Sequence, residues 1–586
     1  MTVDLQTPGN ASAHMAGALA RAGTALMTVA SSPRAKKTTR SYDPAVMMNS
    51  LLKLTASIDP ADLFSAQVKA TQEWAGFWVD LWTPQQATDA KDKPRGDRRF
   101  ADPRWEQPYF RAARDAYLLA SRQLRDLVSS AKIEDTSSQA MAGFLLDQYL
   151  NAISPTNFVM TNPEVVQRTR ETAGANLVNG FAHVLEDFAA GKGIVKRRAA
   201  ADVFEKGKTI AATPGSVVFQ NKLFQLIQYA PTTPDVSLEP LLYVPPLVNR
   251  YYMIDLQPKS SLVRWLVEQG RTVFVISWVN PDDSLRDCAL EDYVLTGVVE
   301  AIGAVRRATD GAKVDLFSFC LGGTLGAMAL AWLEAKGRAN EVNSATLIGT
   351  MLDFSNLGEW AAFVHEAHMD ALDDHIGGKG YIDANELQQL FSAVRANDLI
   401  WSSVVDHYLL DRPAPPSDLL TWFEDGARIP AAFMKSYNRS LLHANGLTAP
   451  GGFTIGDVAI DLAAMRTPAM VIALKADHVS AWNAVYDSSK LLGGPVTFIL
   501  GGSGHNAGVI NPPAANKHGY WTNPDLAGTA DTWLESAEKH PGSWWPEWVR
   551  WLDRNGSGKR VAARQPGEGG LSVIEAAPGT YATTSY

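Results

Sequence analysis

The stretch of residues 318–324, Ser-Phe-Cys-Leu-Gly-Gly-Thr, constrains the fold of this chain more than any other feature. It follows a short apolar run, residues 314–317, which is typical of a buried strand. It precedes residues 325–335, an alanine- and leucine-rich run that is typical of a helix. The pattern predicts a strand, a tight turn and a helix, with the thiol of Cys320 at the turn.

This arrangement is the nucleophile elbow of α/β-hydrolases, in which small residues around the nucleophile allow a sharp turn that raises the reactive atom above the sheet. Ser318 and Gly322 occupy the small positions on either side of Cys320. A thiol at a helix N-terminus lies at the positive end of the helix dipole, which favours the reactive thiolate. The alternative is a buried structural cysteine, the usual fate of a lone Cys.

The same fold places the acid and the base of a triad after later strands, in that order. One strand-like run, residues 469–474, is followed by Asp477, and another, residues 496–500, leads into a glycine-rich loop that contains His505. Taken alone, Asp477 could be a helix cap and His505 a surface loop histidine. Three residues in the right order at three strand ends favour a catalytic triad of Cys320, Asp477 and His505.

A further strand is predicted at residues 241–244, and the two prolines after it have no N–H to donate. The first available donors are therefore the N–H groups of Leu247 and Val248. In α/β-hydrolases the second donor follows the nucleophile. We predict an oxyanion hole formed by Leu247 or Val248 together with Leu321.

These motifs resemble those of class I polyhydroxyalkanoate synthases, also called poly(3-hydroxyalkanoate) polymerases. The family's Gly-or-Ser-x-Cys-x-Gly-Gly box is matched by residues 318–323, its Asp-His-x-x-x-Trp segment by residues 477–482, and its Ser-Gly-His-x-Ala-Gly-x-x-Asn-Pro-Pro segment by residues 503–513. The resemblance extends from about Phe100 to the end of the chain. Further matching stretches are residues 154–158, 161–164, 213–215, 218–221, 225–232, 240–246 and 273–281.

The chain departs from the family pattern close to these motifs. The first box position is Ser318 where many members have Gly, Asn506 follows the histidine, and Ala481 replaces a common proline. The stretch 423–426 also differs from the usual sequence. No triad position is lost, so the departures bear on substrate fit and on the behaviour of the lid.

A chain of 586 residues exceeds the size at which a single core stops growing, so we expect several domains. The fold class that we predict is an α/β-hydrolase catalytic domain with an inserted cap, preceded by a mainly helical N-terminal domain. The resemblance implies that the cap covers the cysteine and takes part in dimerisation. The predicted segments are a flexible N-terminal segment and linker (1–99), the helical domain (100–235), the two parts of the catalytic core (236–350 and 465–555), the cap (351–464) and a C-terminal tail (556–586).

The 53 basic and 62 acidic residues give a net charge of −9, and no basic run is interleaved with aromatic residues. Nucleic acid is therefore a poor candidate partner. An anionic substrate needs a local basic patch, because the overall field repels it. The only two cysteines, Cys288 and Cys320, exclude a disulfide framework and fit a reducing cytosol, so we expect a cytoplasmic protein.

The N-terminal region contains neither a convincing signal peptide nor a membrane span. Further along, Trp74, Phe77, Trp78 and Leu81 follow the spacing of one helix face. This face either packs on the protein or lies on a hydrophobic surface, such as a polymer granule or a granule-coating protein.

A histidine-rich stretch of the predicted cap invites a metal interpretation. It contains His365, Glu366, His368 and His375, but the spacing is not H-E-x-x-H and no cysteine accompanies it. We therefore expect no metal site.

The resemblance implies that the protein polymerises (R)-3-hydroxyacyl-CoA, chiefly 3-hydroxybutyryl-CoA, into a polyester with release of coenzyme A. His505 then takes the thiol proton and later activates the attacking hydroxyl, while Asp477 orients His505 or helps with the hydroxyl proton. His478 is a secondary candidate for the base. No cofactor is expected, since coenzyme A is part of the substrate and a product. Two alternatives stay open, a thioesterase if water enters the site and a catalytically silent granule-coating protein.

The same resemblance implies partners and a location. We expect a homodimer at the surface of polyester granules, in contact with the growing chain and with granule-coating proteins.

Overall fold

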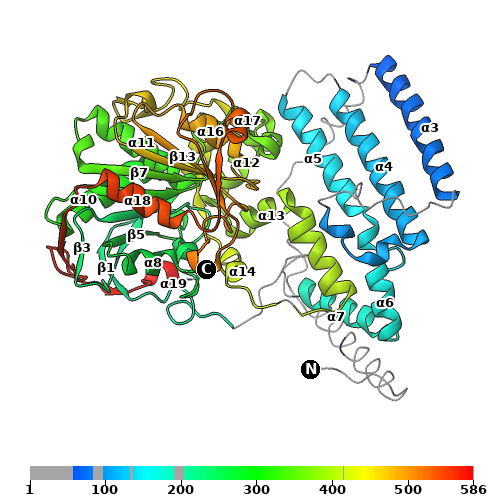
Figure 1. Ribbon diagram of the computed structural model, residues 1–586, viewed down its shortest axis with the longest axis horizontal. Coiled ribbons are helices and arrows are strands. Elements are labelled where there is room, and N and C mark those ends of the chain that lie inside the picture. The colour runs from blue at the N-terminus through cyan, green and yellow to red at the C-terminus, as the bar shows by residue number, and fades with distance from the viewer. Residues whose placement is uncertain are drawn as a thin grey trace. The chain divides into compact units, whose positions relative to one another are not determined.

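The computed structural model of the protein describes residues 21, 57, 59–82, 97–131, 136–189, 203–413 and 415–584 (Figure 1). Most of the expected N-terminal segment and linker, residues 1–99, lies outside these residues. The chain divides into two compact units. Unit 1 comprises Met1–Ala200, Ala361–His368 and Gln389–Pro416, and unit 2 comprises Ala201–Trp360, Met369–Gln388 and Ser417–Tyr586.

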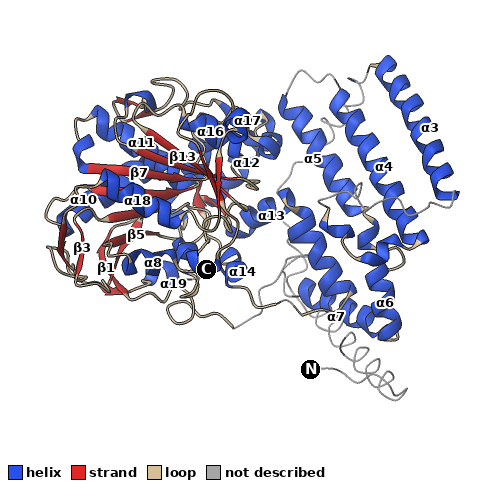
Figure 2. Ribbon diagram, in the orientation of Figure 1, coloured by secondary structure: helices blue, strands red, loops and turns tan. Residues whose placement is uncertain are grey.

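Unit 1 consists of helices (Figure 2). Helix α6 illustrates how the sequence sets a helix start. Pro163 is its first residue, and Asn162 caps it by accepting hydrogen bonds from the N–H groups of Glu164 and Val165. The main helices of unit 1 are α3 (Pro60–Trp82), α4 (Pro108–Ser130), α5 (Thr136–Ala152), α6 (Pro163–Glu171) and α7 (Ala175–Ala189).

Part of the stretch predicted as a cap packs within unit 1. The short helix η10 (Val404–Leu409) lies against α7, where Gly180 leaves room for the carbonyl oxygen of Tyr408 and Asn176 Nδ2 donates to the carbonyl of Leu409 at 2.6 Å. A Cβ at position 180 would overlap that carbonyl oxygen. The close approach explains the glycine in the middle of a helix.

Unit 2 is built on an eleven-stranded sheet with the order β15-β14-β13-β12-β7-β6-β4-β5-β2-β1-β17. The six strands from β13 to β5 in this order run parallel, and antiparallel strands flank them on both sides. The strands are β1 (Gly215–Gln220), β2 (Phe224–Tyr229), β4 (Leu241–Val244), β5 (Val273–Trp278), β6 (Val314–Phe319), β7 (Val342–Ile348), β12 (Ala469–Leu474), β13 (Val496–Gly501), β14 (Tyr520–Thr522), β15 (Glu538–His540) and β17 (Glu575–Ala576).

Both faces of the sheet are buried, which is why its central strands read as continuous apolar runs. In β12, Val471 belongs to the core on one face and Ile472 to the core on the other. The first core is covered by α10 (Glu300–Ala308), α11 (Leu321–Ala335) and α16 (Trp482–Ser489), and the second by α8 (Leu262–Glu268) and α18 (Trp545–Asn555). The strands predicted at residues 241–244, 469–474 and 496–500 are confirmed as β4, β12 and β13.

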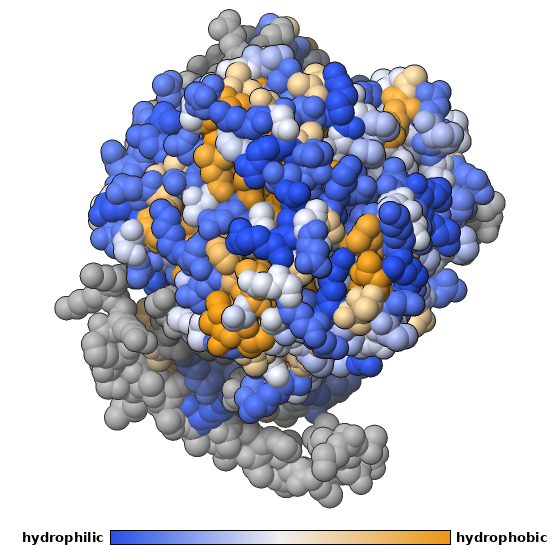
Figure 3. All heavy atoms as spheres, turned by 90° about the vertical axis from the view of Figure 1, so that its left-hand side faces the viewer, coloured by the Kyte–Doolittle hydropathy of each residue, from blue (hydrophilic) through white to orange (hydrophobic). Residues whose placement is uncertain are grey.

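The region after residue 555 is part of the sheet system. β16 (Arg560–Ala562) pairs with β3 (Asp235–Ser237), and β17 extends the main sheet by pairing with β1. Within the described residues no helix is both long and apolar enough to cross a membrane. The face drawn in Figure 3 is mostly hydrophilic, with apolar patches that are separated from one another.

Candidate active site

Cys320 lies at the turn between β6 and α11, as the sequence predicts. Its backbone has φ 53° and ψ −127°, a conformation that costs a non-glycine residue strain energy, and its N–H donates to the carbonyl of Ile348 at 2.9 Å. A Cβ at Gly322 would overlap the carbonyl oxygen of Val244, and one at Gly323 would overlap Thr350. Gly322 lets α11 start directly against the end of β4, and Gly323 lets it pass close to the loop after β7. The turn therefore matches a nucleophile elbow.

His505 and Asp477 meet at the carboxyl ends of β12 and β13. The Nδ1 atom of His505 lies 2.6 Å from Oδ2 of Asp477. The other carboxylate oxygen of Asp477 accepts hydrogen bonds from the N–H groups of Val479 (2.8 Å) and Ser480 (2.9 Å). The Asp477 side chain is fully buried and that of His505 is 8% exposed. Because both carboxylate oxygens are engaged, Asp477 fixes the orientation of the imidazole and leaves Nε2 for another partner.

The electrostatics of His505 tie it to Cys320. Burial of the ring opposes its charged form, but the charges of Asp477 and Cys320, together with hydrogen bonds to both, outweigh burial and raise the pKa of His505 to about 10. The ring of Phe319 packs 4.6 Å from the imidazole, measured between ring centroids. The structure thus brings together the three residues proposed from the sequence as a triad.

The predicted oxyanion donors flank the elbow. Leu321 is the first residue of α11, and Leu247 and Val248 follow the end of β4, whose Val244 is paired with Ser318 of β6. The indole N–H of Trp278 donates to the carbonyl of Pro245 at 2.9 Å and holds this loop. Among the described residues, the backbone N–H groups of Leu247, Val248 and Leu321 donate to no protein acceptor. Their role as oxyanion donors stays a prediction.

His478 differs from His505 in its surroundings. It follows Asp477 in the same loop and is exposed, whereas His505 is buried. The base must contact the thiol, and the charge of Cys320 and a hydrogen bond to it act on His505, which supports His505 over His478.

Two tyrosines near the thiol were not identified from the sequence. Burial, and then the charge of Cys320, raise the pKa of Tyr243 in β4 and that of Tyr437 in the inserted segment. Tyr437 begins the short helix η11 (Tyr437–His443). Both belong to apolar surroundings, where a tyrosine is a common core residue, so no local pattern marks them.

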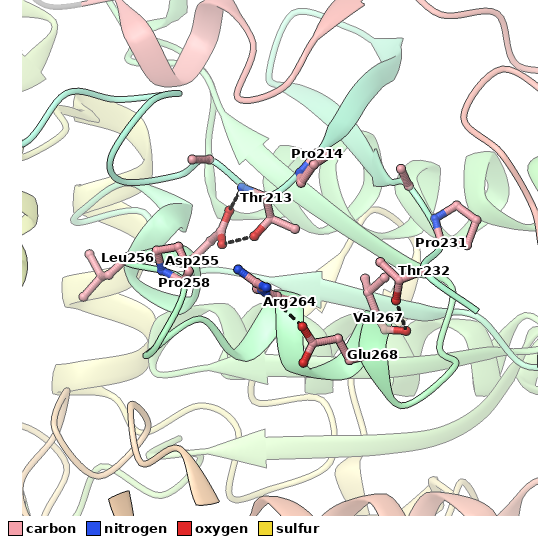
Figure 4. A pocket seen from close by; sticks show the side chains of 12 residues that line it. Thr213, Pro214, Pro231, Thr232, Asp255, Leu256, Pro258, Arg264, Val267 and Glu268 are labelled. Atoms are coloured by element: carbon pink, nitrogen blue, oxygen red, sulfur yellow. Dashed lines mark hydrogen bonds and ion pairs between the residues drawn. The ribbon is translucent and has the colours of Figure 1, made fainter. Parts of the chain in front are cut away.

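A separate pocket of about 420 Å³ lies elsewhere in unit 2 (Figure 4). Thr213 Oγ1 donates to the buried carboxylate of Asp255 at 2.5 Å, and Arg264 pairs with Glu268 at 2.9 Å. None of the predicted site residues lines this pocket. Within the described residues, no group of three or more His, Cys, Asp or Glu is arranged to hold a metal ion.

The comparisons with known proteins agree with these motifs. Residues 96–266 match the family described as Poly-beta-hydroxybutyrate polymerase (PhaC) N-terminus, and residues 240–512 match the alpha/beta hydrolase fold. The second match confirms the predicted fold of the catalytic part.

Curated relatives extend this similarity over most of the chain. The chain is 40% identical over 529 residues to the poly(3-hydroxyalkanoate) polymerase of Methylorubrum extorquens, which covers 89% of this chain and 87% of the relative. It is 36% identical over 591 residues to the poly(3-hydroxyalkanoate) polymerase subunit PhaC of Rhizobium etli (98% and 92%). The corresponding subunit of Cupriavidus necator is 39% identical over 534 residues (89% of each chain). The chain therefore belongs to the poly(3-hydroxyalkanoate) polymerase family, and it is an enzyme that synthesises a polyester.

Proposed function

We propose that the enzyme polymerises (R)-3-hydroxyacyl-CoA, chiefly 3-hydroxybutyryl-CoA, and that Cys320 carries the acyl chain as a thioester. The observation that supports this proposal best is the position of Cys320 at a strained elbow beside a buried imidazole whose Nδ1 is held by Asp477 at 2.6 Å. The short-chain preference rests on the resemblance to class I enzymes.

Loading begins with the transfer of the thiol proton of Cys320 to His505. Asp477 favours the protonated imidazole, so His505 accepts this proton and the sulfur attacks as a thiolate. The thiolate attacks the thioester carbonyl, and the oxyanion is stabilised by the N–H groups of Leu321 and of Leu247 or Val248. The bond to the coenzyme A sulfur then breaks, and His505 returns the proton to this leaving group. One thioester replaces another, so loading is nearly balanced in energy.

Elongation uses the same groups with a different nucleophile. His505, now neutral, takes the proton of a 3-hydroxyl group, whose oxygen attacks the acyl group on Cys320. An ester bond forms, the bond to the Cys320 sulfur breaks, and the thiolate and imidazolium are restored. Of the two roles considered for Asp477, orientation of His505 is the better supported, because its second oxygen is occupied by two backbone N–H groups. No cofactor is required in this cycle.

Granule association is supported by helix α3 of unit 1. Phe64 is 69% exposed and Trp78 is 52% exposed on this helix. Trp74 is half-buried instead, and its indole N–H donates to Gln123 of α4 at 3.1 Å. One side of the predicted apolar stripe therefore packs on the protein, and the other fits contact with polymer or a granule-coating protein. Leu63, Val68 and Val79 add to the exposed apolar surface.

A thioesterase is the second candidate, because an elbow and triad of this kind serve water as well as a hydroxyl. Purified enzyme is incubated with 3-hydroxybutyryl-CoA, and free coenzyme A, free acid and insoluble polymer are measured. We expect the amount of released coenzyme A to rise in proportion to the amount of insoluble polymer. Free acid without polymer would favour the thioesterase, and no turnover would favour the coat protein.

A further inference from the structure

The enzyme must attract an anionic substrate although its own net charge is −9. Coenzyme A carries its negative charges on the phosphates of its nucleotide part, at the far end of a long pantetheine arm. A local basic patch near the elbow would bind them. An arginine or lysine that pairs with a carboxylate contributes little net charge. Candidates for binding the phosphates are therefore lysines close to the triad loops that pair with no carboxylate.

Lys475 and Lys539 form such a pair around Trp521. The Nζ atom of Lys475 lies 4.3 Å from the centre of the Trp521 ring, and that of Lys539 lies 5.3 Å from it. Across the sheet, Leu500 of β13 pairs with Trp521 of β14, and Trp521 pairs with Lys539 of β15. Cross-strand partners point to the same face, which explains why the lysine and the indole meet.

The patch lies next to the loops of the triad. Lys475 follows the end of β12 and is two residues before Asp477. Its N–H donates to the carbonyl of Gly501 at 2.8 Å, and the N–H of Ala476 donates to the carbonyl of Ser503 at 2.9 Å, two residues before His505. The ammonium groups therefore gather at the carboxyl ends of the strands that carry the acid and the base.

No carboxylate in the described part of the chain neutralises the patch. Among these residues, neither Lys475 Nζ nor Lys539 Nζ has a carboxylate oxygen within 4.0 Å. Glu538 and His540, the neighbours of Lys539 along β15, alternate to the opposite face of the sheet, where His540 stacks on Tyr520 at 4.8 Å. The indole holds both ammonium groups in place without cancelling their charge.

A second tryptophan with two cations provides the contrast. Lys336 lies 5.8 Å and Arg338 5.7 Å from the ring of Trp332. Each of these cations is neutralised, Lys336 by Asp457 at 2.9 Å and Arg338 by Glu341 at 2.7 Å. They follow the C-terminal end of α11, a helix of 15 residues that starts at the elbow and is about 22 Å long. Unpaired charge is thus found at the end of the sheet that carries Cys320.

We propose that Lys475, Lys539 and Trp521 bind the phosphate groups of the coenzyme A part of the substrate. The two ammonium groups pair with phosphate oxygens, and Trp521 positions them. This inference rests on the proposed acyl-CoA substrate and names the surface that recognises its nucleotide. The pantetheine arm then leads from the patch to Cys320.

The test compares 3-hydroxybutyryl-CoA with 3-hydroxybutyryl-pantetheine, which has the same thioester and no nucleotide. In the double variant Lys475→Gln/Lys539→Gln, the ratio of kcat/KM for the coenzyme A thioester to that for the pantetheine thioester should fall about tenfold, as expected for two exposed ion pairs. The loss should come from KM and should shrink as salt is added. Lys336→Gln should leave the ratio at the wild-type value.

An unchanged ratio in the double variant would overturn the proposal, even if both activities fell together. Trp521→Leu should lower the same ratio to a smaller extent, since it removes the platform and keeps the charges. If the wild-type enzyme turned over neither thioester, the proposed function would fail instead, which separates the two outcomes. Calorimetric binding of free coenzyme A to Cys320→Ala, with and without the two lysines, gives a readout that needs no turnover, and equal affinities there would also contradict the proposal.

Discussion

The two ends of the central strands of unit 2 each bury a carboxylate, but the two carboxylates have different partners. At the carboxyl ends, Asp477 uses one oxygen for two backbone N–H groups and the other for His505. At the amino ends, Asp315 of β6 accepts from Asn343 (2.8 Å) and Ser344 (2.7 Å) with one oxygen, and its other oxygen has no partner among the described residues. The first carboxylate is hydrogen-bonded to an imidazole, whereas the second is hydrogen-bonded only to neutral side chains.

This difference shows in the pKa values. Asp477 raises the pKa of His505 to about 10, against the effect of burial. Burial raises the pKa of Asp315 itself to about 6, because its neutral hydrogen-bond donors only partly offset the loss of water. The buried carboxylate that faces a histidine, Asp477, acts on the protonation of that histidine. The buried carboxylate without such a partner, Asp315, makes the free energy of unfolding depend on pH.

The largest expected effect comes from removing the thiol. Cys320→Ala should lower coenzyme A release by about 10⁴-fold or more, since the covalent step has no other nucleophile. Cys288→Ala is the matched control, because Cys288 is buried in the hydrophobic core and should leave kcat close to wild type. Equal losses in the two variants would mean that Cys320 acts only through packing. Release of coenzyme A during polymer formation is the measurement.

The two histidines should differ almost as strongly. His505→Gln should leave almost no activity, because the proton carrier is lost. His478→Gln should be much milder, since this residue is exposed. The reverse order would show that the base has been assigned to the wrong histidine.

Removing the charge of Asp477 should act through His505. Asp477→Asn should lower kcat by about 10³-fold and should bring the pKa of His505 down from about 10, because the carboxylate favours the imidazolium. The imidazolium is present below the pKa and is lost as pH rises through it, so the variant should lose it at lower pH than wild type. Following the His505 ring proton by NMR over a pH series measures this shift. An unchanged titration would contradict the orientation and charge assigned to Asp477.

At the other end of the sheet the expected effect is on stability. The folded-state pKa of Asp315 is raised to about 6, so its contribution favours folding at low pH and is lost as pH rises from about 4 through about 6. The difference between the folded and unfolded pKa values of this carboxyl corresponds to about 3 kcal/mol of unfolding free energy at pH 7. Asp315→Asn should remove this pH dependence from the free energy of unfolding and should keep kcat close to wild type.

Urea unfolding of wild type and Asp315→Asn at pH 5 and pH 7 provides the comparison. Relative to wild type, the free energy of unfolding of Asp315→Asn should be higher at pH 7 than at pH 5. A loss of kcat in Asp315→Asn as large as that in Asp477→Asn would remove the distinction between the two ends of the sheet.

Much of the site could be predicted because its signals are local. The glycines of residues 318–324 specify a close turn in the chain itself, and the buried strands β4, β12 and β13 are continuous apolar runs bounded by turn residues. Asp477 and His505 follow two of those strands directly. Parallel strands bring their carboxyl ends to one edge, so the triad followed from strand order.

The remaining features depend on contacts between distant residues. β17 pairs Glu575 with Val217, and η10 lies against α7 although more than two hundred residues separate them. Periodicity within a short segment carries no information about such partners. The lysine–tryptophan patch depends on the register of β14 and β15, three-residue strands that are too short to give a period-two signal.

The covalent role of Cys320 is tested by trapping the acyl-enzyme. The enzyme is mixed with 3-hydroxybutyryl-CoA, quenched in acid during the first turnover, digested and analysed by mass spectrometry. We expect a 3-hydroxybutyryl group on the peptide that contains Cys320, with one coenzyme A released per labelled chain and no label in Cys320→Ala. A label on another residue, or release of coenzyme A with no label at all, would contradict that role.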